Sequence, residues 1–257
     1  MTGTGGQERS DPGIGTGGQE RSDPGIGGHG RGVAVVTGGG RNLGRAIVLA
    51  LARDGFDVVV NTRVDAEQAE KVAAEAREHG VTAAVAVADV ADPAAVERMF
   101  AVADELGPLR VVVHNAALRT RIPVYDVTAA DWAAVRSVTL DGAMNCVLAA
   151  LPRLRSGGGS IVSIIGGNAL RGDPGRFHVS TAKYGLVGMT KALAAACAAD
   201  HVNVNAVSPS HMNPEPGPDA DAEAQRRREA VADAVAFLAG PAGCDVTGQL
   251  IEVGAQR

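Results

Sequence analysis

Short apolar runs alternate with longer amphipathic stretches along most of the chain. The runs are four to six residues long and rich in Val, Ile and Ala, which is typical of strands that are buried on both faces. We expect seven of them, at residues 33–37, 57–60, 83–87, 109–113, 160–165, 202–207 and 249–253. The stretches between them predict helices at 43–54, 65–79, 93–106, 130–154, 180–199 and 222–239.

This alternation predicts the fold class. Strands separated by helices form a parallel sheet, and right-handed crossovers place the helices on both of its faces. We therefore expect an α/β protein with a single-domain, doubly wound Rossmann fold and a parallel seven-stranded sheet.

The beginning of the chain does not share this pattern. Residues 3–14 read GTGGQERSDPGI, and residues 15–26 repeat the same twelve letters. Twelve of the 34 glycines lie within the first 32 residues. A polar repeat of this composition cannot bury a core. We expect residues 1–31 to be a disordered glycine-rich tail and residues 32–257 to form the domain.

Composition and charge remove several classes of function. The net charge is −5 and no extended basic block stands out, so no nucleic-acid or membrane partner is implied. No apolar run approaches the length of a membrane span. The cysteines, Cys146, Cys197 and Cys244, are odd in number and far apart, which argues against disulfides and suits a cytoplasmic protein. The histidines show no spacing typical of a metal site.

Glycines gather where the first strand meets the first helix. Gly38, Gly39, Gly40 and Gly44 allow the backbone to turn tightly and to approach a pyrophosphate. The helix that follows offers unpaired N–H groups and the positive end of its dipole. The position of the turn in an alternating chain predicts a dinucleotide site.

At this turn the chain resembles the short-chain dehydrogenase/reductase family, whose motif reads TGxxxGxG. Thr37, Gly38 and Gly44 match it, while Asn42 stands at the usual middle glycine. The resemblance extends from Gly32 to the C-terminus. It recurs in Asp89-Val90, His114-Asn115-Ala116-Ala117, Val187–Leu193, Val204–Pro209, Val235–Ala239 and Thr247-Gly248-Gln249.

The resemblance implies a nicotinamide dinucleotide cofactor. The residues it assigns to that cofactor are Thr37, Gly38, Gly40, Arg41, Asn42, Leu43, Gly44, Arg63, Asp89, Val90, Asn115, Ala116, Lys183 and Pro209.

Charge favours NADP(H) over NAD(H). Relatives that bind NAD end the second strand with an acid that accepts from the ribose 2′-hydroxyl. Here the strand ends Val60-Asn61-Thr62-Arg63, without an acid at its tip, and Arg41 lies in the glycine turn. Two guanidinium groups suit a 2′-phosphate. The alternative is that both arginines are solvated surface residues.

The catalytic positions depart from the family. Its reaction uses Asn, Ser, Tyr and Lys, with the Tyr hydroxyl giving or taking the proton. The Lys is kept as Lys183. The positions expected for Tyr, Ser and Asn hold Val179, Gly166 and Thr139. The cofactor can still bind, but the family's proton relay is missing.

Another residue would have to supply the proton. We choose His178, which adjoins the missing Tyr and has a suitable intrinsic pKa. The other candidates are Ser180, Asn168, His211 and Tyr184. The last of these is turned about 100° from Lys183 around a helix. For His178 and for each of these residues, the alternative is an ordinary packed or surface side chain.

Three functions remain open. The first is an NADP(H)-dependent oxidoreductase acting on a small carbonyl or alcohol with atypical catalytic residues. The second is a non-redox enzyme on the same scaffold, such as a cyclase, dehydratase or isomerase. The third is a catalytically silent, cofactor-binding partner. The first is favoured by analogy with the family, and the same analogy predicts a homodimer or homotetramer formed through helices 130–154 and 178–200.

Overall fold

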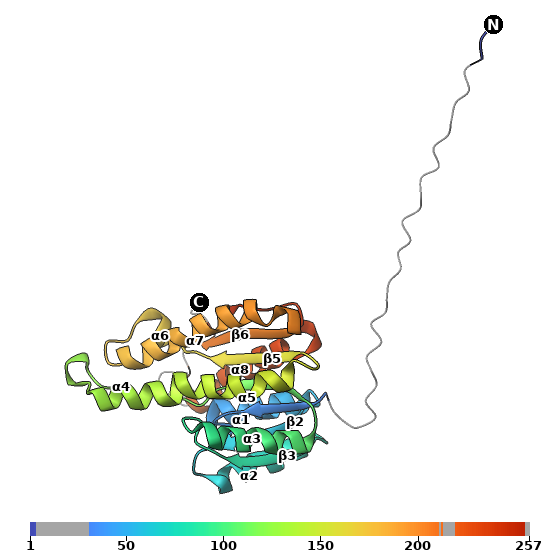
Figure 1. Cartoon of the computed structure of the whole chain (residues 1–257). Helices are drawn as coiled ribbons and strands as arrows, with labels where there is room; N and C mark the ends of the chain where they lie inside the picture. The colour runs from blue at the N-terminus through green and yellow to red at the C-terminus, as the bar shows by residue number, and fades with distance from the viewer. Residues whose placement is uncertain (4–30, 211, 213–218, 255–257) are drawn as a thin grey trace.

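Seven parallel strands form the centre of the protein. The computed structural model describes residues 1–3, 31–210, 212 and 219–254 (Figure 1). The sheet has the order β3-β2-β1-β4-β5-β6-β7, and every pair is parallel. The strands are β1 (Val33–Val36), β2 (Asp57–Thr62), β3 (Ala83–Val87), β4 (Leu109–His114), β5 (Gly159–Ile164), β6 (Val202–Pro209) and β7 (Leu250–Val253). The predicted fold class is confirmed. The predicted tail lies almost wholly outside the described residues.

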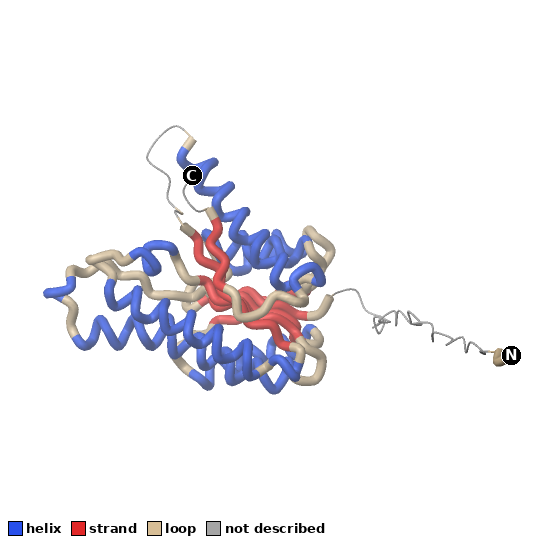
Figure 2. The backbone as a smooth tube through the Cα atoms, turned by 90° about the horizontal axis from the view of Figure 1, so that it is seen from above, coloured by secondary structure: helices blue, strands red, loops and turns tan. Residues whose placement is uncertain are grey.

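Helices cover both faces of the sheet, as the view from above shows (Figure 2). One layer contains α1 (Asn42–Arg53), α2 (Ala66–Arg77) and α8 (Ala220–Ala239), and the other contains α3 (Pro93–Leu106), α5 (Gly142–Leu154) and α7 (Phe177–Ala196). Successive side chains of a strand point to opposite faces. In β1, Ala34 and Val36 therefore pack in the first layer and Val33 and Val35 in the second.

The helix predicted at 130–154 is present as a continuous helical run, Ala129–Leu154, but it is not α-helical throughout. It consists of α4 (Ala129–Arg136), a π-helical segment Ser137–Asp141, and α5. A π segment inserts an extra residue into the turn and is common at functional sites. Hydrophobic periodicity does not reveal it, because the apolar face continues on both sides.

The segment after β5 also differs from the prediction. The helix α6 (Gly167–Arg171) was not expected, because five residues carry no readable periodicity. The helix predicted at 180–199 begins three residues earlier, at Phe177, and ends at Ala196.

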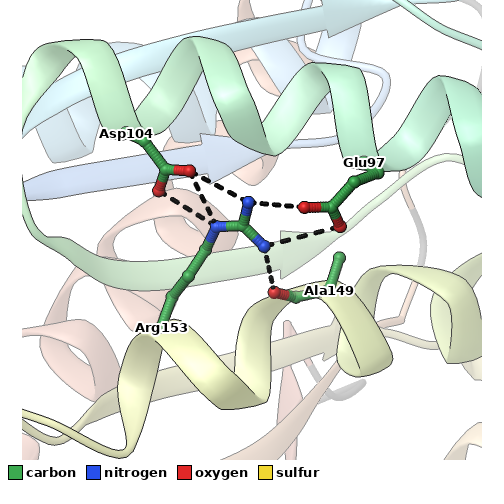
Figure 3. Close-up of polar contacts among 4 residues, drawn as sticks. All are labelled: Glu97, Asp104, Ala149 and Arg153. Carbon is green, nitrogen blue, oxygen red and sulfur yellow. Dashed lines mark hydrogen bonds and ion pairs between the residues drawn. The ribbon is translucent and has the colours of Figure 1, made fainter.

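Arg153 joins the two helices α3 and α5 (Figure 3). Its guanidinium contacts Glu97 at 2.6 Å and Asp104 at 2.9 Å on α3, and it donates to the carbonyl of Ala149 at 2.7 Å. It also lies 5.6 Å from the ring centroid of Phe100. One side chain that is only 20% exposed thus connects two helices of one layer.

Removing this guanidinium should loosen the α3–α5 contact. We expect Arg153→Met to lower the free energy of unfolding by about 1–2 kcal/mol, because several charge-assisted hydrogen bonds are lost at a partly buried site. This corresponds to a melting temperature lower by roughly 2–8 °C. The control is Arg98→Met, whose arginine is 72% exposed and 3.9 Å from its acid. Equal melting temperatures for the two variants would contradict the role given to Arg153.

Candidate active site

The glycine turn between β1 and α1 lies at the carboxyl edge of the sheet, where the strand order reverses between β1 and β4. Gly38 has φ +62°, a conformation that favours glycine. A Cβ on Gly44 would collide with the carbonyl oxygen of Gly38, so the helix can approach the turn only without a side chain there. Arg41, the residue before α1, makes no side-chain cap, which leaves the first helical amides for a ligand.

Asn42 explains how the family's middle glycine can be replaced. Its φ is +49°, in the left-handed region. Asn tolerates this region better than most other side chains. The turn therefore keeps its geometry with an added amide, and Asn42 lines the larger of the two cavities described below.

Two predicted cofactor residues hold the turn against β4. The Thr37 hydroxyl accepts from the backbone amides of Asn115 and Ala116, at 3.0 Å each. The Asn115 side chain donates to the carbonyls of Thr37 and Gly38, at 2.9 Å each. Thr37, Asn115 and Gly44 line neither cavity, so they act by positioning the turn.

A cavity of about 350 Å³, here called the Arg63 cavity, opens beside the end of β2. Arg41 and Arg63 are exposed there, and within the described part of the chain neither side chain has a hydrogen bond or ion pair. Asp65 and Asp89 also line it, and each accepts a backbone amide at 3.0 Å. The other predicted cofactor residues in its lining are Gly38, Gly40, Val90 and Ala116.

Asn61, which the sequence interpretation did not assign, fixes the shape of the Arg63 cavity. Its side chain accepts from the Gly38 amide at 3.2 Å and donates to the carbonyls of Ala86 and Ala88 at 3.1 Å each. It is 2% exposed. A polar residue inside an otherwise apolar strand is the sequence feature that could have identified Asn61 as part of the site.

A second cavity, of about 460 Å³, lies on the other side of the turn and is called the Lys183 cavity. The predicted residues that line it are Asn42, Leu43, Gly166, Asn168, Val179, Ser180, Lys183 and Pro209. Together the two cavities bring most of the predicted site residues to one edge of the sheet. Their arrangement fits a dinucleotide that crosses the glycine turn, with one half on each side.

Lys183 is the buried titratable group of the Lys183 cavity. It is 3% exposed, and its Nζ donates to the carbonyl of Ile164 at 2.6 Å. Burial, and secondarily the charge of Arg119, lower the pKa of Lys183 to about 7. His114 on β4 faces the same group. Burial, and secondarily Lys183, lower the pKa of His114 to about 4, so this imidazole is neutral at pH 7.

Two of the three positions at which the family resemblance predicts Ser, Tyr and Asn line the Lys183 cavity. Gly166 and Val179 both line the cavity, and a Cβ on Gly166 would meet no atom within 4 Å. Thr139 lies in the π segment, where its hydroxyl accepts from the Leu118 amide at 3.2 Å. Thr139 therefore supports the loop after β4, and the space beside Gly166 is open.

The structure does not place His178 in the lining of the Lys183 cavity. Because α7 begins at Phe177, His178 is already helical; it is 2% exposed, and its Nε2 pairs with the Thr120 hydroxyl at 2.9 Å. Tyr184 is exposed, with its hydroxyl donating to the Leu170 carbonyl at 3.1 Å. His211 lies outside the described residues. Ser180 lines the cavity, and its buried Oγ has no hydrogen-bond partner among the described residues.

Three arginines of the Lys183 cavity were not identified from the sequence. Arg119 follows β4, Arg176 precedes α7, and Arg228 belongs to α8. Nothing in the sequence indicates that these separate segments meet. Within the described residues, no group of three His, Cys, Asp or Glu side chains could hold a metal ion.

Comparison with known proteins identifies the family. The short chain dehydrogenase model matches residues 32–224. The chain belongs to the short-chain dehydrogenase/reductase family. Members of this family bind nicotinamide dinucleotides and are oxidoreductases.

Named relatives share the fold and part of the sequence. A 3-oxoacyl-(acyl-carrier-protein) reductase from Staphylococcus aureus is 32% identical over 160 residues, which span 62% of this chain and 65% of that protein. Acetoin dehydrogenase from Salmonella typhimurium has a TM-score of 0.78 at 26% identity, covering 86% of this chain and 94% of its own. Carveol dehydrogenase from Mycobacterium avium, solved with NAD, has a TM-score of 0.78 at 25% identity, covering 87% and 96%.

Proposed function

We propose that this protein is an NADP(H)-dependent oxidoreductase that acts on a small carbonyl or alcohol substrate. The observation that carries the proposal is the pairing of the two cavities across the glycine turn, one with Lys183 and one with Arg63. Arg41 and Arg63 support the choice of NADP(H), since guanidinium groups bind phosphate well and the described structure gives them no acid partner.

We further propose Lys183 as the proton donor of reduction, in place of the missing Tyr. When bound, the reduced nicotinamide supplies the hydride. The Lys183 ammonium then gives a proton to the carbonyl oxygen, and the neutral amine recovers a proton from water. A general acid works best with a pKa near the working pH, and Lys183 meets this condition because it is buried beside Arg119.

Ser180 supports this assignment as a group that orients the carbonyl. It lies three residues before Lys183 on α7, so the two side chains share a helix face, and both line the Lys183 cavity. A hydroxyl without a partner can donate to a carbonyl oxygen. His178 remains the competing candidate, but its Nε2 is occupied by Thr120.

A non-redox enzyme or a catalytically silent partner is the alternative. Both are favoured by the replacement of Tyr, Ser and Asn at Val179, Gly166 and Thr139. The test is NADPH oxidation across a panel of small carbonyl compounds. Product without cofactor turnover would indicate a non-redox enzyme, and cofactor binding without any product would indicate a silent partner.

The outer face of α5 suggests a homodimer or homotetramer. Met144 and Leu148 on α5 are 46% and 59% exposed, and Tyr184 on α7 is 53% exposed. The helical run Ala129–Leu154 is long and apolar enough to cross a membrane by length and composition, but 44% of its most apolar window is buried. We propose that its exposed apolar side chains bind another subunit in the cytoplasm.

The choice of NADP(H) predicts a selective effect at Arg63. Arg63→Ala should weaken NADPH binding about 10- to 100-fold, because charge-assisted hydrogen bonds to the 2′-phosphate are lost. NADH binding should change little, since it has no such phosphate. Calorimetry measures both, with Arg98→Ala as the control, because Arg98 lies on α3 and lines neither cavity. Equal affinity of the wild type for the two cofactors would contradict the choice.

The role of Lys183 predicts the pH dependence of reduction. Because the ammonium is the reactive form and its pKa is about 7, kcat/KM should be flat below pH 7 and fall tenfold per unit above it. Lys183→Arg keeps a charge but not the acidity, so turnover should fall about 10²- to 10⁴-fold. NADPH affinity, measured separately, distinguishes this from lost binding. If His178→Gln removes the pH dependence instead, His178 is the donor.

The proposed subunit contact predicts the effect of a charge on α5. Leu148→Glu should produce a smaller species in light scattering, because a buried unpaired carboxylate destabilises an apolar interface. Val87→Glu, at a 57% exposed position on the edge strand, is the control. A wild type that is monomeric at micromolar concentration would refute the contact.

A further inference from the structure

The Lys183 cavity is positively charged beyond what its lysine alone supplies. Arg119, Arg176 and Arg228 line it together with Lys183, and the described lining contains no Asp or Glu. The chain as a whole carries net negative charge, so this local excess of cations is specific to the cavity.

The cations lie close enough to perturb one another. Arg119 lowers the pKa of Lys183, and the pKa of Arg119 is itself lowered by its protein surroundings, by Arg176 and by Arg41. Arg119 is exposed and also lines the cavity, so it lies at the cavity mouth. Like charges held together without an acid destabilise the unliganded site, and a bound anion would relieve that repulsion.

One acid reaches this group. Asp173 pairs with Arg121, which does not line the cavity, at 3.0 Å, and it forms a longer ion pair of 3.8 Å with the Nε of Arg176. That Nε is buried and has no hydrogen-bond partner within the described structure. Within the described residues, Arg119 has neither a hydrogen bond nor an ion pair. The Arg119 guanidinium and the Nε of Arg176 are therefore hydrogen-bond donors that a carboxylate could use.

We infer that the substrate is a keto acid, whose carboxylate binds Arg119 and Arg176 while its carbonyl lies at Lys183. This inference rests on the proposed oxidoreductase function and narrows its substrate class. In reduction, hydride adds to the carbonyl carbon and the Lys183 ammonium protonates the oxygen. The products are a hydroxy acid and NADP⁺, and solvent restores the lysine proton.

The cofactor is the other possible source of an anion, because its pyrophosphate would bind at the same turn. The amides at the start of α1 suit that group, while Arg41, proposed above to bind the 2′-phosphate, lines the Arg63 cavity. Arg119 and Arg176 line only the Lys183 cavity. A test must therefore compare cofactor and substrate binding in the same variant.

The experiment uses the full chain saturated with NADP⁺, so that no turnover is required. Pyruvate, acetoacetate and levulinate, with the carbonyl at three distances from the carboxylate, are titrated by calorimetry beside their methyl esters. We expect at least one acid to bind about tenfold or more tightly than its ester, since a charge-assisted pair is lost in the ester. Arg119→Gln should abolish that difference and leave NADP⁺ affinity within about twofold. Arg155→Gln, a surface residue at the far end of α5, is the control.

Two results would overturn the inference. In the first, none of the three acids binds more tightly than its ester. In the second, Arg119→Gln weakens NADP⁺ as strongly as the acid, which would assign the arginines to the cofactor. Failure of the wild type to bind NADP⁺ at all would instead refute the proposed function, so the two failures are distinguishable.

Discussion

The close approach of Gly44 to the Gly38 carbonyl is the contact on which the site depends. It brings the first turn of α1 against β1, and Asn115 and Thr37 hold the same turn against β4. The unpaired backbone amides at the start of α1 therefore lie between β1 and β4, where the strand order reverses. A side chain at Gly44 would separate helix from turn, and the two cavities would no longer meet across it.

The two halves of the site follow the family resemblance to different extents. On the dinucleotide side, Asn42 stands at a position where the motif usually has glycine, and its φ is in the left-handed region. On the chemical side, Gly166, Val179 and Thr139 stand where the resemblance predicts Ser, Tyr and Asn. The pKa of Lys183 depends chiefly on the burial of this side chain.

The sequence predicted what periodicity and glycine positions determine. The bounds of β3 and α3 match the predictions; Gly80 lies before β3, and Gly107-Pro108 directly follows α3. His178 illustrates the limit. The sequence predicts a helix from residue 180, with His178 before it, whereas α7 begins at Phe177 and the imidazole Nε2 pairs with the Thr120 hydroxyl. The arginine cluster could not be predicted, because its members come from three segments that only the fold brings together.

The arginine cluster also connects substrate binding to the protonation of Lys183. Without an anion, burial and secondarily the charge of Arg119 favour the neutral amine and lower the pKa of Lys183 to about 7. A carboxylate beside Arg119 cancels part of that field and so favours the ammonium, which is the form that reduction needs. A neutral ester in the same cavity would leave the field unchanged. Under the proposed function, the charge that selects the substrate would thus also prepare the acid that protonates it.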